Sequence, residues 1–187
     1  MGITEMAQSP GVNDLVLLWM NQTGRVGVAP QDYSTGIPLG GVDQIINWNV
    51  AKLGAQPTLA QLSALVSTWQ AQQDATAAQA TVNANVNAAL AAGIAITSTS
   101  TPALNATYMT NAAAQAAVTS VITGIATGAG LPGGGATFIF LDASGVPHTV
   151  TQAQFIALAT AIRNYIYALD LYAANQGSQP AASVAIP

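Results

Sequence analysis

Residues 136–172 constrain the fold of this chain more than any other stretch, because they predict two strands and a helix in succession. Residues 136–141 are rich in β-branched and aromatic side chains, which suit a pleated, half-buried surface. Asp142 and Gly145 stand where type I turns favour Asp and Gly, so the chain should reverse between them. Residues 146–150 then form the returning strand of a β-hairpin.

A helix should follow this hairpin directly. Thr151 and Gln154 have the spacing of a capping box, in which the hydroxyl and the amide satisfy free N–H groups at a helix start. Downstream, apolar residues recur at steps of three and four, which places them on one helix face: Phe155, Leu158, Ile162, Ile166 and Leu169. The stretch predicts a hairpin lying on a helix, and nothing in it points to a chemical reaction.

Charged residues are scarce in this chain. Asp, Glu, Lys and Arg make up 5% of its 187 residues, against roughly 25% in ordinary globular domains. Two interpretations stay open: a surface solvated by amides and hydroxyls, or a subunit covered by neighbours, since interface cores are depleted in charge. Disorder is not expected, because disordered chains combine low hydrophobicity with high charge, and here 51% of the residues are hydrophobic.

The charge balance also excludes classes of partner. A net charge of −4 with three basic residues, Arg25, Lys52 and Arg163, cannot neutralise a run of phosphates, so we expect no nucleic-acid binding. No apolar run approaches the ~18 residues of a membrane-spanning helix, so we expect no membrane insertion. Residues 1–10 carry Glu5 and no cation and do not fit a signal peptide. The chain has no cysteine, which removes disulfides and thiolate sites.

We expect four segments along the chain and an α+β fold that is mainly helical, with a small antiparallel sheet or hairpin packed on helices. Residues 1–57 form an N-terminal arm or attachment segment, and residues 58–92 form a long helix rich in Ala, Gln and Asn. Residues 93–174 form a C-terminal α+β domain. Residues 175–187, without any period, form an extended or disordered tail.

Within the arm, periodicity does not decide whether residues 12–20 are a short helix or a buried strand. Residues 24–41 are rich in Gly and should form a loop. Residues 42–54 favour a short helix that ends at Gly54, the preferred residue type just past a helix C-terminus.

The segment 58–92 predicts either one long helix or two helices broken near Asp74, since a 35-residue pattern far exceeds the mean of ~11–12 residues. Thr58 and Gln61 form the capping box at its start.

The apolar stripe of the segment 58–92 is thin, and its Ala-rich faces permit close approach of a neighbouring helix. We therefore expect this segment to contact another chain. Tyrosines on the last helix are also suited to interfaces. The candidate interface residues are Val82, Val86, Leu90, Tyr165, Tyr167 and Tyr172.

Between these segments, residues 94–102 alternate like an exposed strand and residues 103–108 return through a turn. Asn111 can cap a helix that ends at Gly128.

No catalytic, cofactor-binding or metal-binding residue is expected, and therefore no enzyme activity and no cofactor. The glycine run 133–135 lacks the Lys-Ser/Thr of a phosphate loop and precedes a strand. His148, the one histidine, should be an exposed strand residue, and a metal site there would need Asp142 or Asp170 to approach by folding. The seven scattered carboxylates form no recognisable motif.

The segment Ile96–Tyr108, ITSTSTPALNATY, resembles a bacteriophage domain of unknown function that occurs near the C-termini of tail-fibre and other tail proteins. In that family a helix leads into a TPAL-(Asn/Asp)-x-TY segment, followed by a capped helix, a short hairpin and a final helix with aromatic residues near its end. The resemblance covers about residues 82–172, and residues 46–58 also resemble segments that precede the domain in phage tail proteins. This chain departs from the family in its low charge and in Asn111, where Asp is commoner. The family has no assigned activity, so no functional residue transfers.

The resemblance implies a non-enzymatic structural subunit of a phage tail, in the baseplate, a fibre or a fibre attachment. Such a subunit is made in the bacterial host cytoplasm and resides in the virion. Its partners would be other tail proteins and copies of itself, with a trimer favoured. Two alternatives stay open: a tail-fibre assembly chaperone that is not retained in the virion, and a module that binds a host surface glycan or receptor.

Overall fold

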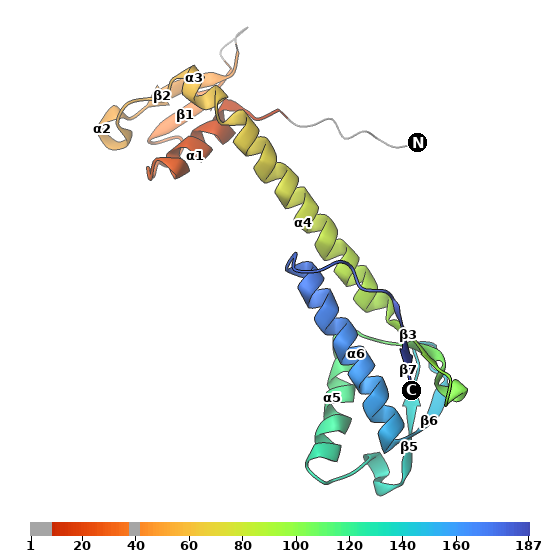
Figure 1. The fold of residues 1–187 in the computed structure, drawn as a ribbon. Coiled ribbons are helices and arrows are strands. Elements are labelled where there is room, and N and C mark those ends of the chain that lie inside the picture. The colour runs from red at the N-terminus through yellow and green to blue at the C-terminus, as the bar shows by residue number, and fades with distance from the viewer. Residues whose placement is uncertain (1–8, 38–41) are drawn as a thin grey trace. The chain divides into compact units, whose positions relative to one another are not determined.

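The computed structural model describes residues 9–37 and 42–187 (Figure 1). The chain divides into an N-terminal unit up to residue 78 and a C-terminal unit from residue 79. Each unit has its own hydrophobic core. Small sheets pack against helices, so the predicted α+β class is confirmed. In the described part of the chain, no helix is long and apolar enough to cross a membrane.

The N-terminal unit is a helix and a hairpin closed by two further helical segments. Its elements are α1 (Val12–Gln22), β1 (Tyr33–Gly36), β2 (Gln44–Trp48), α2 (Val50–Leu53), α3 (Leu59–Ser63) and the first turns of α4 (Val66–Ala92). Strands β1 and β2 pair antiparallel. Its buried core consists of Leu15, Val16, Leu18, Trp19, Met20, Tyr33, Leu53, Leu62, Leu65 and Trp69.

The structure corrects the sequence analysis in this unit. Residues 12–20 are helical, within α1. The predicted loop over 24–41 contains strand β1, and residues 38–41 lie outside the described part. The helix predicted over 42–54 is wrong for its first half, because pairing with β1 draws residues 44–48 into a strand. Only α2 remains helical, and it ends before Gly54 as predicted, with that residue at φ +71°.

The long helical segment is broken near its start and not at Asp74. The capping box of Thr58 and Gln61 is confirmed: the Gln61 N–H donates to the Thr58 hydroxyl over 3.2 Å. It opens the short helix α3, which ends at Ser63, and α4 then runs without a break for 27 residues. The break places Leu62 and Trp69, from two different helices, in one core.

The C-terminal unit contains two small sheets and three helices. After α4 its elements are β3 (Ile94–Ser98), η1 (Pro102–Leu104), β4 (Ala106–Tyr108), α5 (Ala112–Ala126), η2 (Pro132–Gly134), β5 (Thr137–Leu141), β6 (Pro147–Thr151), α6 (Gln152–Ala173) and β7 (Ser183–Ile186). Asn111 caps α5 as predicted, accepting a 3.0 Å hydrogen bond from the Ala114 N–H. The helix ends at Ala126, two residues earlier than expected.

The central sheet has the order β4-β3-β7. Strand β3 pairs antiparallel with β4 and parallel with β7. Ile94 and Ile96 are buried, so the expectation of an exposed strand is wrong. Residues 183–186 of the predicted extended or disordered tail form the strand β7, which adds to the sheet and buries Ile186 in the core.

The hairpin and the helix that follows are confirmed. Strands β5 and β6 pair antiparallel, and the Gly145 N–H donates to the Asp142 carbonyl over 3.1 Å to close the turn. The Thr151 capping box starts α6. Of the predicted apolar face of α6, four residues are buried and Ile166 is partly buried. Phe155 contacts the rings of Phe138 and Phe140 at centroid distances of 5.1 and 5.2 Å.

Candidate functional site

His148 and Asp142 are the one arrangement in the described chain that resembles catalytic machinery. The His148 Nε2 lies 3.2 Å from the Asp142 Oδ2, and its Nδ1 lies 2.7 Å from the Ala103 carbonyl oxygen. The two side chains are only 11% and 10% exposed. The expectation of an exposed histidine is therefore wrong, because the turn at Asp142 folds the carboxylate back over the strand.

The surroundings of this pair assign it a structural role. The Asp142 Oδ1 accepts from the backbone N–H groups of Ser144 and Val146, both at 2.8 Å. The Val146 bond, and then the bond with His148, hold the pKa of Asp142 below its usual range. Burial raises the pKa of the neighbouring Tyr108 to about 12, so this phenol stays protonated. Both ring nitrogens of His148 have a protein partner, and the pair fastens the hairpin to η1.

Nor do the described residues bring a metal site together. In residues 9–37 and 42–187, no three His, Asp or Glu side chains are grouped so that they could hold an ion.

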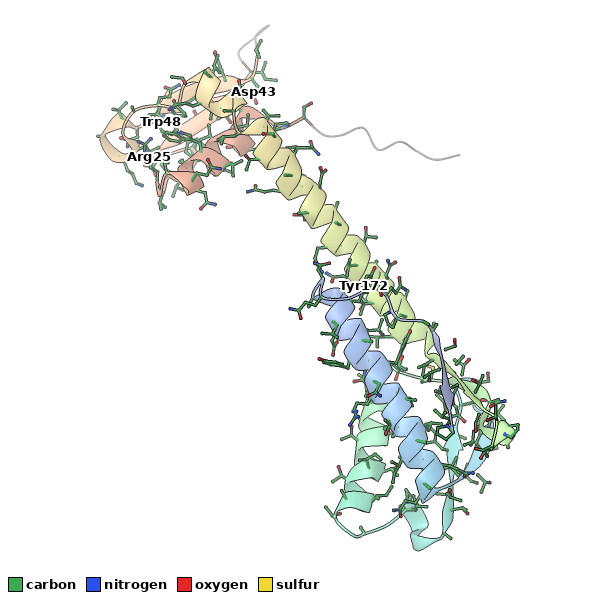
Figure 2. The ribbon with its side chains drawn as sticks, in the orientation of Figure 1. Arg25, Asp43, Trp48 and Tyr172 are labelled. Atoms are coloured by element: carbon green, nitrogen blue, oxygen red, sulfur yellow. The ribbon has the colours of Figure 1, made fainter. Side chains whose placement is uncertain are left out.

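Most of the predicted interface residues serve the chain's own C-terminal unit. Val86 and Leu90 pack against its core, and Tyr165 is 6% exposed within it. Tyr172 is half-buried, and its hydroxyl accepts a 3.2 Å hydrogen bond from the Asn85 amide (Figure 2). Val82 is half-buried. Tyr167 alone among these six is well exposed, at 62%.

The partner that the sequence analysis placed on α4 is thus supplied, over this part of the helix, by α6. The Gln79 side chain donates to the Ala173 carbonyl over 3.1 Å and accepts from the Asn175 amide over 2.8 Å. Amide groups of α4 and of the segment after α6 thus pair within one chain. A narrow apolar stripe on α4 is enough for this packing, because only a few of its side chains contact the core of the C-terminal unit.

The N-terminal unit instead exposes large apolar side chains, which sequence reasoning did not single out. Among the described residues, fourteen large hydrophobic side chains are exposed, and nine of them belong to this unit. We call these nine the exposed apolar set. They are Leu17, Val26, Val28, Ile37, Val42, Ile46, Val50, Leu59 and Val66, each at least 40% exposed. The sequence signal for this exposure was the presence of valines in a glycine-rich loop, such as the two that follow Arg25.

Local contacts hold the loop segment of this set in place. Arg25 lies over the Trp19 ring, 4.2 Å from its centroid, and donates to the Ala55 carbonyl over 3.2 Å (Figure 2). Asp32 accepts from the Val28 N–H over 2.9 Å and pairs with Lys52. The Lys52 bond, followed by the Val28 bond, lowers the pKa of Asp32. The valines are therefore presented on a fixed backbone.

The strand β2 presents another member of the set at an irregularity in its pairing with β1. Ile45 and Trp48 turn inward, and the Trp48 ring meets Trp19 edge-on at 5.8 Å. Ile46 turns outward, is 59% exposed, and lies where the register skips a residue between the pairs Ser34–Asn47 and Thr35–Ile45. The acids of the same region serve the backbone, since Asp14 and Asp43 accept from the N–H groups of Gly11 and Val12 at the start of α1. These two carboxylates therefore bond to backbone groups of their own unit.

The C-terminal unit has an apolar groove between α5 and α6, with a volume of about 460 Å³. Helix α5 contains no charged residue. The groove is lined mainly by Val118, Ile122, Ile125, Ile156, Ala159 and Arg163.

One comparison with known proteins gives a match. The family model of a domain of unknown function, DUF4376, matches residues 71–176, which is more than half of the chain. No curated protein and no solved structure matches this chain. The matched range contains the groove and both small strands of the hairpin, whereas the exposed apolar set lies before it.

Proposed function

Because this chain belongs to the DUF4376 family, a domain of unknown function, we propose a role for it from its own surface. It is a non-enzymatic structural subunit of a bacteriophage tail, in the baseplate, a fibre or a fibre attachment. The C-terminal unit is the family domain, and the N-terminal unit attaches it to other tail proteins.

The exposed apolar set carries this proposal. Many large apolar side chains exposed on one small unit are suited to protein–protein contact, and interface cores combine apolar residues with few charges. Here the charged side chains of the same unit, such as Arg25 and Asp32, bond to their own chain. Little is left on this unit except apolar and uncharged polar groups for a partner to meet.

This chemistry favours a retained subunit over a chaperone that binds and leaves. Permanent interfaces are more hydrophobic than transient ones. A surface with nine exposed large apolar side chains among the described residues of one small unit is suited to being covered for the life of the particle.

The place in a phage tail is supported by the resemblance of Ile96–Tyr108 to phage tail proteins. The expected partners are other tail proteins and further copies of the chain, and the expected location is the virion. A trimer follows from the resemblance alone.

Mass spectrometry of purified phage particles that encode this chain tests its place. The chain should be present in mature virions at a fixed ratio to known tail subunits. Its presence only in infected-cell lysate would favour the chaperone and overturn the structural role.

A substitution in the exposed apolar set tests the attachment. Ile46→Glu should prevent incorporation into particles, because it places an unpaired charge in an apolar contact. Ile139→Glu is the matched control, since both residues lie in two-stranded hairpins and are 59% and 64% exposed. The two variants should fold equally well and differ in particle content. Equal incorporation would exclude this surface as the attachment site.

A further inference from the structure

The outer face of α6 carries the charged residues that the C-terminal unit does not use internally. Asp142 and His148 bond to each other. The remaining two, Arg163 and Asp170, are both exposed and form no ion pair with any described residue. Arg163 donates only a 3.3 Å hydrogen bond to the adjacent Asn164.

These two residues belong to a continuous exposed stripe along the helix. Its members recur at steps of four and three, so they lie on one face. We call it the α6 outer stripe. It consists of Ile156, Thr160, Arg163, Tyr167, Asp170 and the C-cap residue Ala174, all exposed. It includes both of the exposed large hydrophobic residues of α6, at 41% and 62%.

Neighbouring helices leave this stripe uncovered. Helix α5 packs on one flank of α6, where Ala159 is buried. Helix α4 bonds to α6 through Tyr172 and the Ala173 carbonyl (Figures 1 and 2). The stripe lies between these contacts, and its first members, Ile156, Thr160 and Arg163, also line the groove between α5 and α6.

We propose that the α6 outer stripe binds the same stripe of a second copy, with the two helices antiparallel about a two-fold axis at Tyr167. A two-fold contact uses one surface twice, so that surface must complement itself. Arg163 stands four residues before Tyr167 and Asp170 three residues after it. The antiparallel register brings each Arg163 to the Asp170 of the second copy, which makes two ion pairs from one sequence.

The order of charges disfavours the parallel alternative. In a parallel contact each residue meets its own copy, so Arg163 would face Arg163 and Asp170 would face Asp170. Like charges placed against one another oppose association. A parallel threefold bundle at α6 has the same defect, whatever symmetry the rest of the chain adopts.

The centre and the flank of the contact are also suited to a second copy. Tyr167 is a rigid amphipathic ring at the midpoint, the kind of side chain that dominates binding in interfaces. Thr160 borders the groove between α5 and α6, and the register places the second copy's Ala174 beside it. A small side chain at that point lets the helix end approach the apolar wall.

Cysteine crosslinking tests the register, and the chain has no native cysteine to interfere. Tyr167→Cys should form a disulfide-linked dimer under mild oxidation, because the two-fold axis brings this position to its own copy. Thr160→Cys alone should not, since its counterpart lies about two turns beyond the axis on the opposite side. A mixture of Thr160→Cys and Ala174→Cys chains should crosslink to each other.

Charge exchange tests the ion pairs by sedimentation equilibrium of the full chain. Arg163→Asp or Asp170→Arg alone should lower the association constant by about tenfold or more, since each places two like-charged pairs in the contact. An equimolar mixture of the two variants should restore association, because every pair is then opposite in sign. Asp74→Arg, an exposed change on α4 outside the stripe, should leave association unchanged.

Several results would overturn the inference. These are a wild-type chain that stays monomeric, equal self-crosslinking through positions 160 and 167, or a mixture that associates no better than its single variants. Circular dichroism of each variant confirms that it is folded. The inference concerns contact between copies and does not depend on a place in a phage tail, so its failure would leave the virion measurement to decide that role.

Discussion

At the scale of single residues, Gly93 is the position at which the backbone accommodates glycine and no residue with a Cβ. It joins α4 to β3 at φ +79°, and a Cβ there would lie 2.4 Å from the Tyr108 carbonyl oxygen. That oxygen belongs to β4, which pairs with β3, so it cannot move without breaking the sheet. A left-handed turn and close backbone contact therefore coincide at one residue.

Gly93→Ala should destabilise the C-terminal unit by more than the ~1–3 kcal/mol of a strained backbone conformation alone. Gly128→Ala is the matched control, because Gly128 has φ +81° with nothing within 4 Å of its added Cβ. Urea unfolding of both variants measures the difference. Equal losses of stability in the two variants would mean that the Tyr108 carbonyl moves away from the added Cβ at little cost in free energy.

At the scale of elements, the hairpin and α6 behave as one packed piece. Thr151 ends β6 and caps α6, and Phe155, one turn later, is fully buried against two phenylalanines of β5. The cap sets where the helix begins, and the ring fixes which face it turns to the sheet.

Two substitutions separate these contributions. Thr151→Ala should cost about 1 kcal/mol, the usual loss for a helix cap. Phe155→Ala should cost roughly 3–5 kcal/mol, because it opens a cavity in the core. Chemical denaturation followed by far-UV circular dichroism measures both. Small and equal losses would mean that Phe155 is not packed as described.

This element was predictable from sequence because its signals are local. A capping box spans four residues and an apolar face repeats every three or four. The roles of Thr151 and Phe155 can therefore be predicted from a short stretch of sequence. Strand β7 cannot, because its partner β3 is distant along the chain and four residues show no period. Strand β2 was missed because its residues are extended only through pairing with β1, which their own pattern does not reveal. The contact of His148 with the Ala103 carbonyl joins residues 45 positions apart and was missed for the same reason as β7.

The interaction surfaces were less predictable than the fold, again for physical reasons. Val86, Leu90 and Tyr165 were chosen for their chemistry, and the sequence does not say whether α6 or another chain would cover them. Ile46 and Tyr167 are exposed only because of which neighbours the fold places on the opposite face. Exposure is a property of the folded chain.

At the scale of the whole molecule, two separate cores share the single helix α4. The first turns of α4 contribute Trp69 to the N-terminal core, and its last turns contribute Val86 and Leu90 to the C-terminal one. Between them, residues 71–78 are exposed. The units should therefore unfold largely independently.

Calorimetry of core variants tests this independence. Leu62→Ala, at a site 2% exposed in the N-terminal core, should lower one unfolding transition, with a loss of about 2–5 kcal/mol. Phe155→Ala should lower the other transition and leave the first in place. A single transition that shifts in both variants would show that α4 couples the two cores.

The position of β7 beside β3 bears on how the chain is made. A ribosome releases β3 long before it releases β7, so the inner edge of the central sheet waits with unpaired N–H and carbonyl groups while α5, the hairpin and α6 are synthesised. Open edges of this kind recruit strands from other nascent chains. Expression at a high level should therefore yield aggregates built through β3, and a lower expression level should yield a larger fraction of native protein.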